Sequence, residues 1–384
     1  MTEAIEAINS VDRSSPRDTR DDPELDVLVV GGSQAGLAIG WHLAEGGYNF
    51  LVLDAGAEVG ETWRSRWDSL ALFTPAQYDS LPGLPFPGRA ETYPTKDKVA
   101  DYLQAYAANF HLPVKLNSRV TALSRVGHGF EVNTLGDTFR ARQVVVATGP
   151  FQVPFVPPPA RELDTSVTQV HTSAYRNPAS LPAGPVLVVG GGNSGLQIAK
   201  ELASSRSVDV SQGSSPPMLP QRFLGKDLFW WLTRFGLQAR PADSRLGRRM
   251  QARGDFVIGT SRRKLRQAGV RFRPRLAEAE GRTVRFADGS PLDVGVVIWA
   301  TGFRSDYSWI DVPGIVADGR VVHQRGVTDV PGLYFLGLSW LHTRGSALLG
   351  FVNDDAAYLA ERISKRGGAV QSAEAAAGAE RSAG

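Results

Sequence analysis

The sequence predicts an α/β fold of two Rossmann-like domains, the second inserted into the first. Glycine-rich turns recur at residues 31–36 and 190–195, about 160 residues apart. Each follows a short apolar run, typical of a strand buried on both faces of a parallel sheet, and each opens a helix. Glycines in such a turn let the backbone approach a pyrophosphate, and the helix N-terminus offers free amides to hold it. The pattern therefore predicts two dinucleotide sites.

The first turn lies between two predicted strands, residues 27–30 and 50–53, and Gly46 ends the intervening helix. Asp54 closes the second strand, where a carboxylate can accept hydrogen bonds from both ribose hydroxyls of an adenosine. Ser33 stands where the motif's second glycine is expected, so whether this turn binds its ligand weakly stays open. A tight turn without a ligand is the alternative interpretation, and the flanking strands, helix and acid argue against it.

The second turn follows residues 186–189, and all three of its motif glycines are correctly spaced. Its second strand, residues 208–210, ends without an acid. A carboxylate there would repel a 2′-phosphate, so its absence favours NADPH over NADH. The expected phosphate ligands are Ser211, Gln212 and one of Arg206, Arg222 and Lys226.

Two further predicted strands end in Ala-Thr-Gly, at residues 147–149 and 300–302, where small side chains leave room for a cofactor. The long connection after Asp54, rich in Trp, Arg, Pro and Gly, is expected to be a functional loop. A packed excursion anchored by Trp63 and Trp67 is the alternative. Other expected elements are a helix at 96–110, strands at 114–116, 120–123, 130–133, 139–142, 143–146, 294–299 and 333–338, and a helix at 346–363.

These elements give the expected domain plan. Residues 1–23 are expected to be a disordered leader, 24–152 and 296–366 the first domain, 153–295 the second, and 367–384 a disordered tail. Residues 216–275 are expected to form a helical insertion in the second domain. Its aromatic cluster at 228–232 is assigned to the core, with a substrate channel or a subunit contact as alternatives.

The composition excludes several classes of protein. The chain has 384 residues, 42% of them hydrophobic, a net charge of +3 and no cysteine. Without cysteine there is no disulfide scaffold, no Cys-ligated metal and no redox-active CxxC. The six histidines lack metal-ligand spacing, so no metal is expected. No nucleic-acid motif, signal peptide or membrane span is recognised, and a cytoplasmic protein is expected.

Several motifs together resemble the flavin-containing (class B) monooxygenases. They are GGSQAG from Gly31, TWRSRWDSL from Thr62, LPGLPFPG from Leu81, GGGNSG from Gly190, the two Ala-Thr-Gly strand ends and GLYFLGLSWLHTRGSALLGF from Gly332. The resemblance spans about residues 24–366 and is closest to short actinobacterial flavoproteins labelled as potassium-transport flavoproteins. It implies FAD in the first site, NADPH in the second, a small organic substrate, O2 and a homodimer.

Besides Ser33 in the first turn, the chain departs from the family pattern at two places. The signature FxGxxxHxxx(Y/F/W) survives only as His171 and Tyr175, and its final tyrosine favours N- and S-oxygenating members over Baeyer-Villiger enzymes. Pro75 replaces an asparagine that animal members carry beside the flavin, and Gln77 is the expected substitute.

The resemblance also implies residue roles. Gln77 and Arg344 are expected beside the reactive edge of the flavin, as catalytic or substrate-positioning residues. The expected cofactor contacts are Gly31, Ser33, Gln34, Ala35, Gly36, Asp54, Trp63, Arg64, Thr74, Val120, Thr148, Gly149, Gly190, Gly192, Asn193, Ser194, Gly195, Ser211, Gln212, Arg222, Ala300, Thr301, Gly302, Gly337 and Leu348.

The implied activity is that of an NADPH-dependent monooxygenase. Such an enzyme uses a C4a-(hydro)peroxyflavin to oxygenate an amine, a sulfide or a carbonyl compound. An NAD(P)H oxidase or flavin reductase that releases H2O2 is the main alternative, and a non-catalytic nucleotide-binding regulator is a second. A disulfide reductase is excluded unless a partner supplies the thiols, because the chain has no cysteine.

Overall fold

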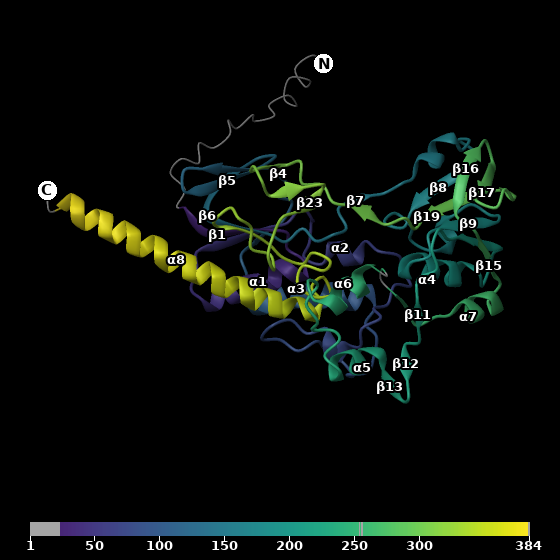
Figure 1. The fold of residues 1–384 in the computed structure, drawn as a ribbon, viewed down its shortest axis with the longest axis horizontal. Helices are drawn as coiled ribbons and strands as arrows, with labels where there is room; N and C mark the ends of the chain where they lie inside the picture. Colours follow the sequence, from purple (N-terminus) through teal and green to yellow (C-terminus); the bar gives the residue numbers. More distant parts are fainter. Residues whose placement is uncertain (1–23, 253, 255, 383–384) are drawn as a thin grey trace, which may run out of the picture.

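The computed structural model describes residues 24–252, 254 and 256–382. The expected disordered leader at 1–23 lies outside the described residues, as do the last two residues of the expected tail. Two bodies built on separate sheets lie side by side, connected by extended segments (Figure 1). The first glycine-rich turn, residues 31–36, belongs to the first body, and the second, residues 190–195, belongs to the second body.

The first body contains an eight-stranded sheet in the order β21-β4-β5-β6-β1-β2-β3, with β24 paired to β6. Pairs among β1, β2, β3, β6 and β24 are parallel, and β4 and β5 form an antiparallel excursion. The strands are β1 (Leu25–Val30), β2 (Phe50–Leu53), β3 (Val114–Lys115), β4 (Val120–Val126), β5 (Gly129–Thr134), β6 (Thr138–Val146), β21 (Ile310–Asp311) and β24 (Leu333–Phe335). The continuous β6 unites the two strands expected at 139–142 and 143–146.

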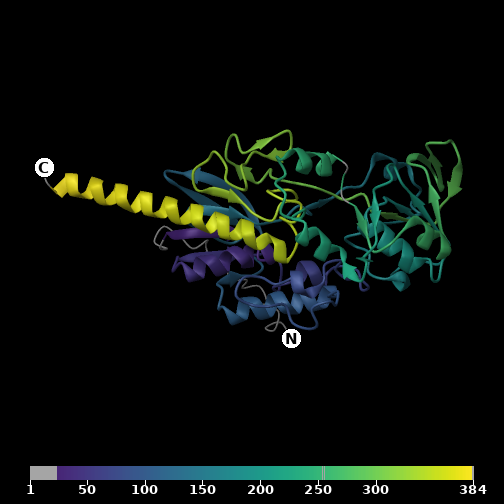
Figure 2. The ribbon, with the colours of Figure 1, turned by 60° about the horizontal axis from the view of Figure 1, so that its bottom comes forward.

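Residues Val27 to Val30 of β1 are buried. A strand with such a continuous apolar run needs helices on both faces of its sheet. The helices of this body are α1 (Gln34–Glu45), α2 (Glu61–Arg64), α3 (Lys96–Asn109) and α8 (Asn353–Ser382). Figure 2 shows the yellow α8 running beside α1, with which it is in contact. The side chains of Leu37, Leu43 and Ile363 are fully buried between these elements and the sheet.

The second body has a five-stranded parallel sheet in the order β15-β10-β9-β19-β8. Its elements are β8 (Thr168–His171), β9 (Val186–Val189), α4 (Asn193–Leu202), β10 (Val208–Ser211), α7 (Arg262–Gln267), β15 (Val270–Arg273) and β19 (Val296–Trp299). Along β9, Val186 and Val188 face one core cluster while Leu187 and Val189 face another. A smaller antiparallel sheet lies beside it, formed by β16 (Leu276–Glu280), β17 (Thr283–Phe286) and β18 (Pro291–Asp293).

The position of β19 corrects the expected domain boundary at residue 296. Because β19 pairs with β9 and β8, residues 296–299 belong to the second body. The chain returns to the first body through β20 (Phe303–Arg304), which pairs antiparallel with the outgoing β7 (Val153–Pro154). A four-residue apolar strand has the same pattern in either sheet, so the sequence alone placed this boundary too early.

The expected helical insertion at 216–275 is only partly helical. It contains α5 (Leu228–Arg234) and α6 (Arg245–Ala252), but also β11 (Met218–Leu219), β12 (Arg222–Phe223), β13 (Lys226–Asp227) and β14 (Val257–Ile258), and it ends in α7 and β15. In the aromatic cluster, Phe229 is fully buried and packs against Phe73, Tyr78 and Phe351 of the first body. That residue is core, as expected.

The C-terminal region also differs from expectation. The helix predicted at 346–363 starts at Asn353, after a 3-10 turn at Gly350–Val352, and continues to Ser382. Residues 367–382, expected to be a disordered tail, are therefore helical and extend α8 away from the body (Figure 1). Alanine and glutamate have high helix propensity, which accounts for the extension. None of the described helices is both long and apolar enough to cross a membrane.

Candidate active site

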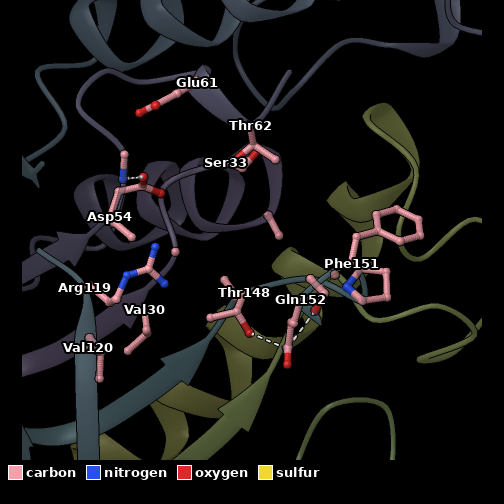
Figure 3. Close-up of a pocket in the computed structure, with 18 of the residues that line it drawn as sticks. Val30, Ser33, Asp54, Glu61, Thr62, Arg119, Val120, Thr148, Phe151 and Gln152 are labelled. Carbon is pink, nitrogen blue, oxygen red and sulfur yellow. Dashed lines mark hydrogen bonds between the residues drawn. The ribbon is translucent and has the colours of Figure 1, made fainter. Parts of the chain in front are cut away.

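A cavity of about 600 Å³ opens at the carboxyl ends of β1 and β6 (Figure 3). Ligands of open α/β sheets bind at this edge. Its floor is the first glycine turn, and its walls come from the loops after β2, β3 and β6 and from the segment that returns from the second body. Its lining includes Ser33, Asp54, Thr62, Arg66, Arg119, Val120, Thr148, Gly149, Phe151, Gln152, Phe303, Gly337 and Ala347.

The first turn has room only for glycine at two positions. Gly31 has φ +109°, and a Cβ on it would lie 2.6 Å from the Ala147 carbonyl oxygen. A Cβ on Gly36 would lie 1.8 Å from the carbonyl oxygen of Gly31. Ser33, in contrast, has φ −89° in extended backbone and begins α1 as its N-cap. The turn therefore accommodates serine at this position without backbone strain.

Asp54 lies at the end of β2 and is held by two backbone amides. Its Oδ2 accepts a 2.5 Å hydrogen bond from the amide of Gly32, and its Oδ1 accepts one of 2.7 Å from Gly56. Figure 3 shows the carboxylate at one end of the cavity, with the Arg119 side chain directed into the space beside it. Sequence analysis missed Arg119, because a lone arginine in a loop carries no recognisable motif.

The loop around α2 contains residues that hold the protein together and residues that face the cavity. Trp63 Nε1 donates to Gln34 Oε1 at 3.2 Å, which ties the loop to the start of α1. Arg64 forms ion pairs with Glu58 at 2.7 Å and Asp101 at 3.0 Å, and it does not line the cavity. Its neighbour Arg66 does.

Arg66 was also missed by the sequence analysis. Its guanidinium lies 6.0 Å from the ring centre of Phe151, just before the outgoing β7, and 5.7 Å from that of Phe303, the first residue of the returning β20. Burial lowers the pKa of Arg66. The positive charge therefore lies in a partly dehydrated position beside the cavity, where it can attract an anion.

The second glycine turn repeats the geometry of the first. Gly190 has φ +121°, and a Cβ there would lie 2.2 Å from the carbonyl oxygen of Ala300. A Cβ on Gly195 would lie 2.4 Å from the carbonyl oxygen of Gly190. Asn193, the first residue of α4, donates to the Phe256 carbonyl at 3.1 Å and accepts from the amide of Ile258 at 2.9 Å. These bonds attach the insertion to the turn.

The two sites are connected through the second Ala-Thr-Gly strand end. His171 Nε2 lies 3.0 Å from the carbonyl oxygen of Gly302, and its ring packs edge-on against Phe303. Burial lowers the pKa of His171 more than the Gly302 contact raises it. The neutral ring then donates from Nε2 to the carbonyl. Thr301 Oγ1 donates to the carbonyl of Phe155 on the outgoing connection.

The expected ligands of a 2′-phosphate lie in different surroundings. The Ser211 hydroxyl donates to the Pro274 carbonyl at 2.9 Å and accepts from the Leu276 amide at 2.8 Å, so it bridges two segments of the protein. Arg222 lies on the β12–β13 hairpin and pairs with Glu91 at 3.0 Å. Figure 1 shows this hairpin apart from β9 and β15, the strands that flank β10. Gln212 lies against the second turn.

The other two basic candidates are also engaged elsewhere. Arg206 donates to the carbonyls of Pro178 at 2.6 Å and Leu181 at 3.1 Å. Lys226 lies 5.7 Å from the ring centre of Trp230 on the hairpin side. Of the side chains in the expected set, the structure therefore brings only that of Gln212 to the turn, while Ser211 contacts the turn through its backbone carbonyl.

The expected catalytic residues, Gln77 and Arg344, do not line the cavity. Gln77 is exposed in a 3-10 turn at Ala76–Tyr78. The Arg344 guanidinium stacks over Phe256 at 3.9 Å. Among the residues expected near the flavin, Thr74 is buried and donates to Asp79, and Leu348 packs against the aromatic cluster around Phe229.

The residues of the first site fit FAD. The glycines at positions 31 and 36 have no Cβ, so the backbone of the turn can pack closely. The N-terminus of α1 can then hold a pyrophosphate, and Asp54 can accept hydrogen bonds from a ribose diol. Gln34 Nε2 reaches the Ala347 carbonyl at 3.5 Å, so the far end of the cavity is bounded by the segment that precedes α8. Among the described residues, no cluster of three or more acidic or histidine side chains could hold a metal.

Known proteins share this arrangement. Residues 28–216 match the family described as pyridine nucleotide-disulphide oxidoreductase. A CzcO-like oxidoreductase of Geobacillus kaustophilus is 47% identical over 341 residues, which cover 88% of this chain and 98% of that protein. The CzcO oxidoreductase of Bacillus subtilis is 38% identical over 340 residues and is covered to 99%.

A solved structure and a more distant relative extend the relationship. A flavin-containing monooxygenase from Stenotrophomonas maltophilia has a TM-score of 0.76 and 29% identity, over 89% of this chain and 98% of that one. The indole-3-pyruvate monooxygenase YUCCA4 of rice is 28% identical over 367 residues, covering 81% of this chain and 82% of that protein. With the two glycine turns and the cavity, these findings confirm the two-domain α/β fold. The chain belongs to the CzcO-like oxidoreductases and is similar to the flavin-containing monooxygenases.

Proposed function

We propose that the protein is an NADPH-dependent monooxygenase that transfers one oxygen atom from O2 to a small organic substrate carrying an amine, a sulfide or a carbonyl group. The flavin supplies the redox and oxygen chemistry when it is bound. The observation that carries the proposal is the pair of nucleotide turns, one in each body, connected through the contact of His171 with Gly302. The monooxygenases among the relatives support the same reaction class.

The side chains of this chain have binding and positioning roles in the proposed reaction. Asp54 holds the ribose of FAD, and the turn from Gly31 to Gly36 holds its pyrophosphate. Trp63 fixes Gln34 at the start of α1. Arg66, dehydrated between Phe151 and Phe303, supplies positive charge where the two bodies meet.

Gln77 and Arg344 remain proposed neighbours of the reactive edge. Arg344 lies close to Ala347 in the chain, and Ala347 lines the cavity. Gln77 is exposed in its 3-10 turn, so its side chain is free to change rotamer. A homodimer and a closer relation to the short actinobacterial flavoproteins stay predictions, as does a cytoplasmic location.

An NAD(P)H oxidase that releases H2O2 is the second candidate function. Two nucleotide sites are sufficient for that activity, since it needs hydride transfer and O2 but no organic substrate. A disulfide reductase is disfavoured despite the fold shared with the bacillithiol disulfide reductase of Bacillus cereus, which is 20% identical. The chain has no cysteine to form a dithiol.

The two candidates differ in what happens after reduction. Protein reconstituted with FAD is reduced anaerobically with NADPH and then mixed with O2 in a stopped-flow spectrometer, while H2O2 is measured. A monooxygenase should show a near-ultraviolet flavin absorbance that persists for seconds, with little H2O2. Immediate return of the oxidised flavin spectrum with stoichiometric H2O2 would support the oxidase instead.

A further inference from the structure

The strand register allows the two nucleotide turns of this chain to be compared with each other. In the first body, the residue that follows the paired ends of β1 and β2 is Asp54. In the second body, the residue that follows the paired ends of β9 and β10 is Gln212. A neutral amide therefore stands at the position that a carboxylate occupies in the first site.

Both side chains lie over the second residue of their turn. Asp54 Oδ2 accepts a hydrogen bond from the amide of Gly32. Gln212 lies so close to Gly191 that a Cβ added there would come within 2.0 Å of its Nε2. This is where the adenosine ribose lies in a Rossmann site. The first turn offers the ribose a negative acceptor, and the second offers it a donor.

A cation from a distant segment accompanies this donor. Arg262, the first residue of α7, donates to Gln212 Oε1 and, at 3.1 Å, to the hydroxyl of Ser215. Its guanidinium lies 4.7 Å from the ring centre of Phe272, which limits its orientation. No carboxylate within the described parts of the chain forms an ion pair with Arg262.

Two donors at this place have no acceptor. The Nε of Arg262 and the Nε2 of Gln212 are both buried without a hydrogen-bond partner. A buried unsatisfied donor costs about 1–3 kcal/mol, so native proteins seldom retain one without a use. A second cation lies next to them, since Arg275 Nε would be 3.2 Å from a Cβ on Gly213. The cluster is suited to an anion with several acceptor oxygens.

We propose that Arg262 and Gln212, with Ser215, bind the 2′-phosphate of NADPH and thereby select it over NADH. The phosphate carries about −1.5 to −2 charges and several acceptor oxygens, which match a guanidinium, an amide and a hydroxyl. Arg262 thus replaces the strand-end arginine that the sequence lacks. Gln212 turns its amide from Gly191 to the phosphate when the ribose enters. The nucleotide's identity rests on the proposed function.

The test measures binding to the FAD-loaded protein without turnover. Dissociation constants are determined by calorimetry for NADP+ and NAD+, and for 2′,5′-ADP and 5′-AMP, which lack nicotinamide. The unsubstituted protein should bind each 2′-phosphorylated nucleotide at least tenfold more tightly. Arg262→Gln should weaken NADP+ and 2′,5′-ADP by about 10- to 100-fold and change NAD+ by less than threefold.

Matched variants separate recognition from folding. Arg263→Gln removes an exposed charge from the next position of α7 and should leave all four constants unchanged. Arg262→Lys keeps the charge without the planar fork and should restore part of the lost affinity. Gln212→Glu places a carboxylate at the position of Asp54 and should shift the preference toward NAD+, because it repels the phosphate.

Two outcomes would overturn the proposal. The unsubstituted protein could bind NADP+ and NAD+ equally, or Arg262→Gln could weaken both by the same factor, which is the result of a structural role. Oxygen transfer is not measured in these assays. If the protein transfers no oxygen but Arg262 still determines nucleotide selectivity, the proposed function is rejected and this site stands. If the protein transfers oxygen but Arg262 does not determine selectivity, this site is rejected and the proposed function stands.

Discussion

The hydroxyl of Thr74 donates a 2.6 Å hydrogen bond to the carboxyl of Asp79, and both side chains are buried in the loop after α2. Asp79 is completely buried, and its other oxygen has no hydrogen-bond partner. Burial raises the pKa of Asp79 to about 7, although the Thr74 bond acts to lower it. The segment directly after Tyr78 therefore contains a carboxyl that stays protonated in mildly acidic solution.

The raised pKa of Asp79 makes stability depend on pH. Below about pH 4 both states are protonated, and between pH 4 and 7 only the unfolded state loses its proton, so this group makes the folded state less stable as pH rises. Above pH 7 the loss is complete, at about 4 kcal/mol for a shift of roughly three pKa units. Asp79→Asn should therefore unfold at higher urea concentration than the unsubstituted protein at pH 8.

At pH 4 the same two proteins should have nearly equal free energies of unfolding. If Asp79→Asn is instead less stable than the unsubstituted protein at pH 8, the prediction is contradicted. The ionised carboxylate would then have a hydrogen-bond or charge partner that is absent from this structure.

Removal of the Asp54 carboxylate should weaken FAD binding. Asp54→Ala takes away the acceptor for the Gly32 and Gly56 amides and for the ribose diol, so the dissociation constant of FAD should rise by about 10- to 100-fold. Titration of the apoprotein with FAD, followed by flavin fluorescence, measures this. Asp137→Ala, which removes a half-exposed partner of Lys115, is the control and should leave the constant unchanged. Equal effects of both substitutions would refute the assignment.

Ser33→Gly should change FAD affinity by less than about threefold. The Ser33 side chain bonds to Gln34 and makes no capping bond to the helix backbone, and the residue has an ordinary φ of −89°. Exchange of serine for glycine at an N-cap costs only a few tenths of a kcal/mol. The same fluorescence titration applies. A tenfold gain in affinity would mean that the serine obstructs the pyrophosphate.

Asp209 should contribute to the stability of the second body through two arginines. It is 1% exposed and accepts from Arg271 at 2.7 Å and Arg273 at 2.8 Å. Burial acts to raise the pKa of Asp209, but the two arginines outweigh it, and the pKa lies below its usual value. This stability is present above about pH 4 and is lost as pH falls through the lowered pKa.

Asp209→Asn should lower the free energy of unfolding at pH 7 by about 1–3 kcal/mol, because a buried charge-assisted acceptor is lost while the half-exposed arginines regain water. Chemical denaturation at pH 7 and at pH 2.5 gives the comparison. A loss that is as large at pH 2.5 as at pH 7 would point to packing and not to charge.

Much of this fold could be predicted from sequence because its signals are local. The run of β1, the glycines at 31 and 190 and the acid at Asp54 lie within single strand-turn-helix units, whose geometry dictates the residue types. The side of the sheet to which β19 belongs is not local, since four apolar residues fit either sheet. The extent of α8 was missed because a tail rich in alanine and glutamate reads equally as a helix or a disordered segment.

The candidate site divides in the same way. Backbone positions such as Gly36 and Gly195 follow from motif spacing, whereas Arg66, Arg119 and Arg262 come from separate segments of the chain with no shared pattern. Sequence spacing indicated Ser211 as a ligand, but its hydroxyl bonds to Pro274 and Leu276, a tertiary contact that spacing does not reveal.

The central claim is that one atom of O2 enters an organic product. The direct measurement incubates the FAD-loaded protein with NADPH, 18O2 and separate panels of amines, sulfides, ketones and 2-oxo acids, and analyses the products by mass spectrometry. The proposed function predicts a product that carries one 18O atom, with NADPH consumed in equal amount and little H2O2. NADPH consumption that yields only H2O2 with every panel would contradict it and identify the protein as an oxidase.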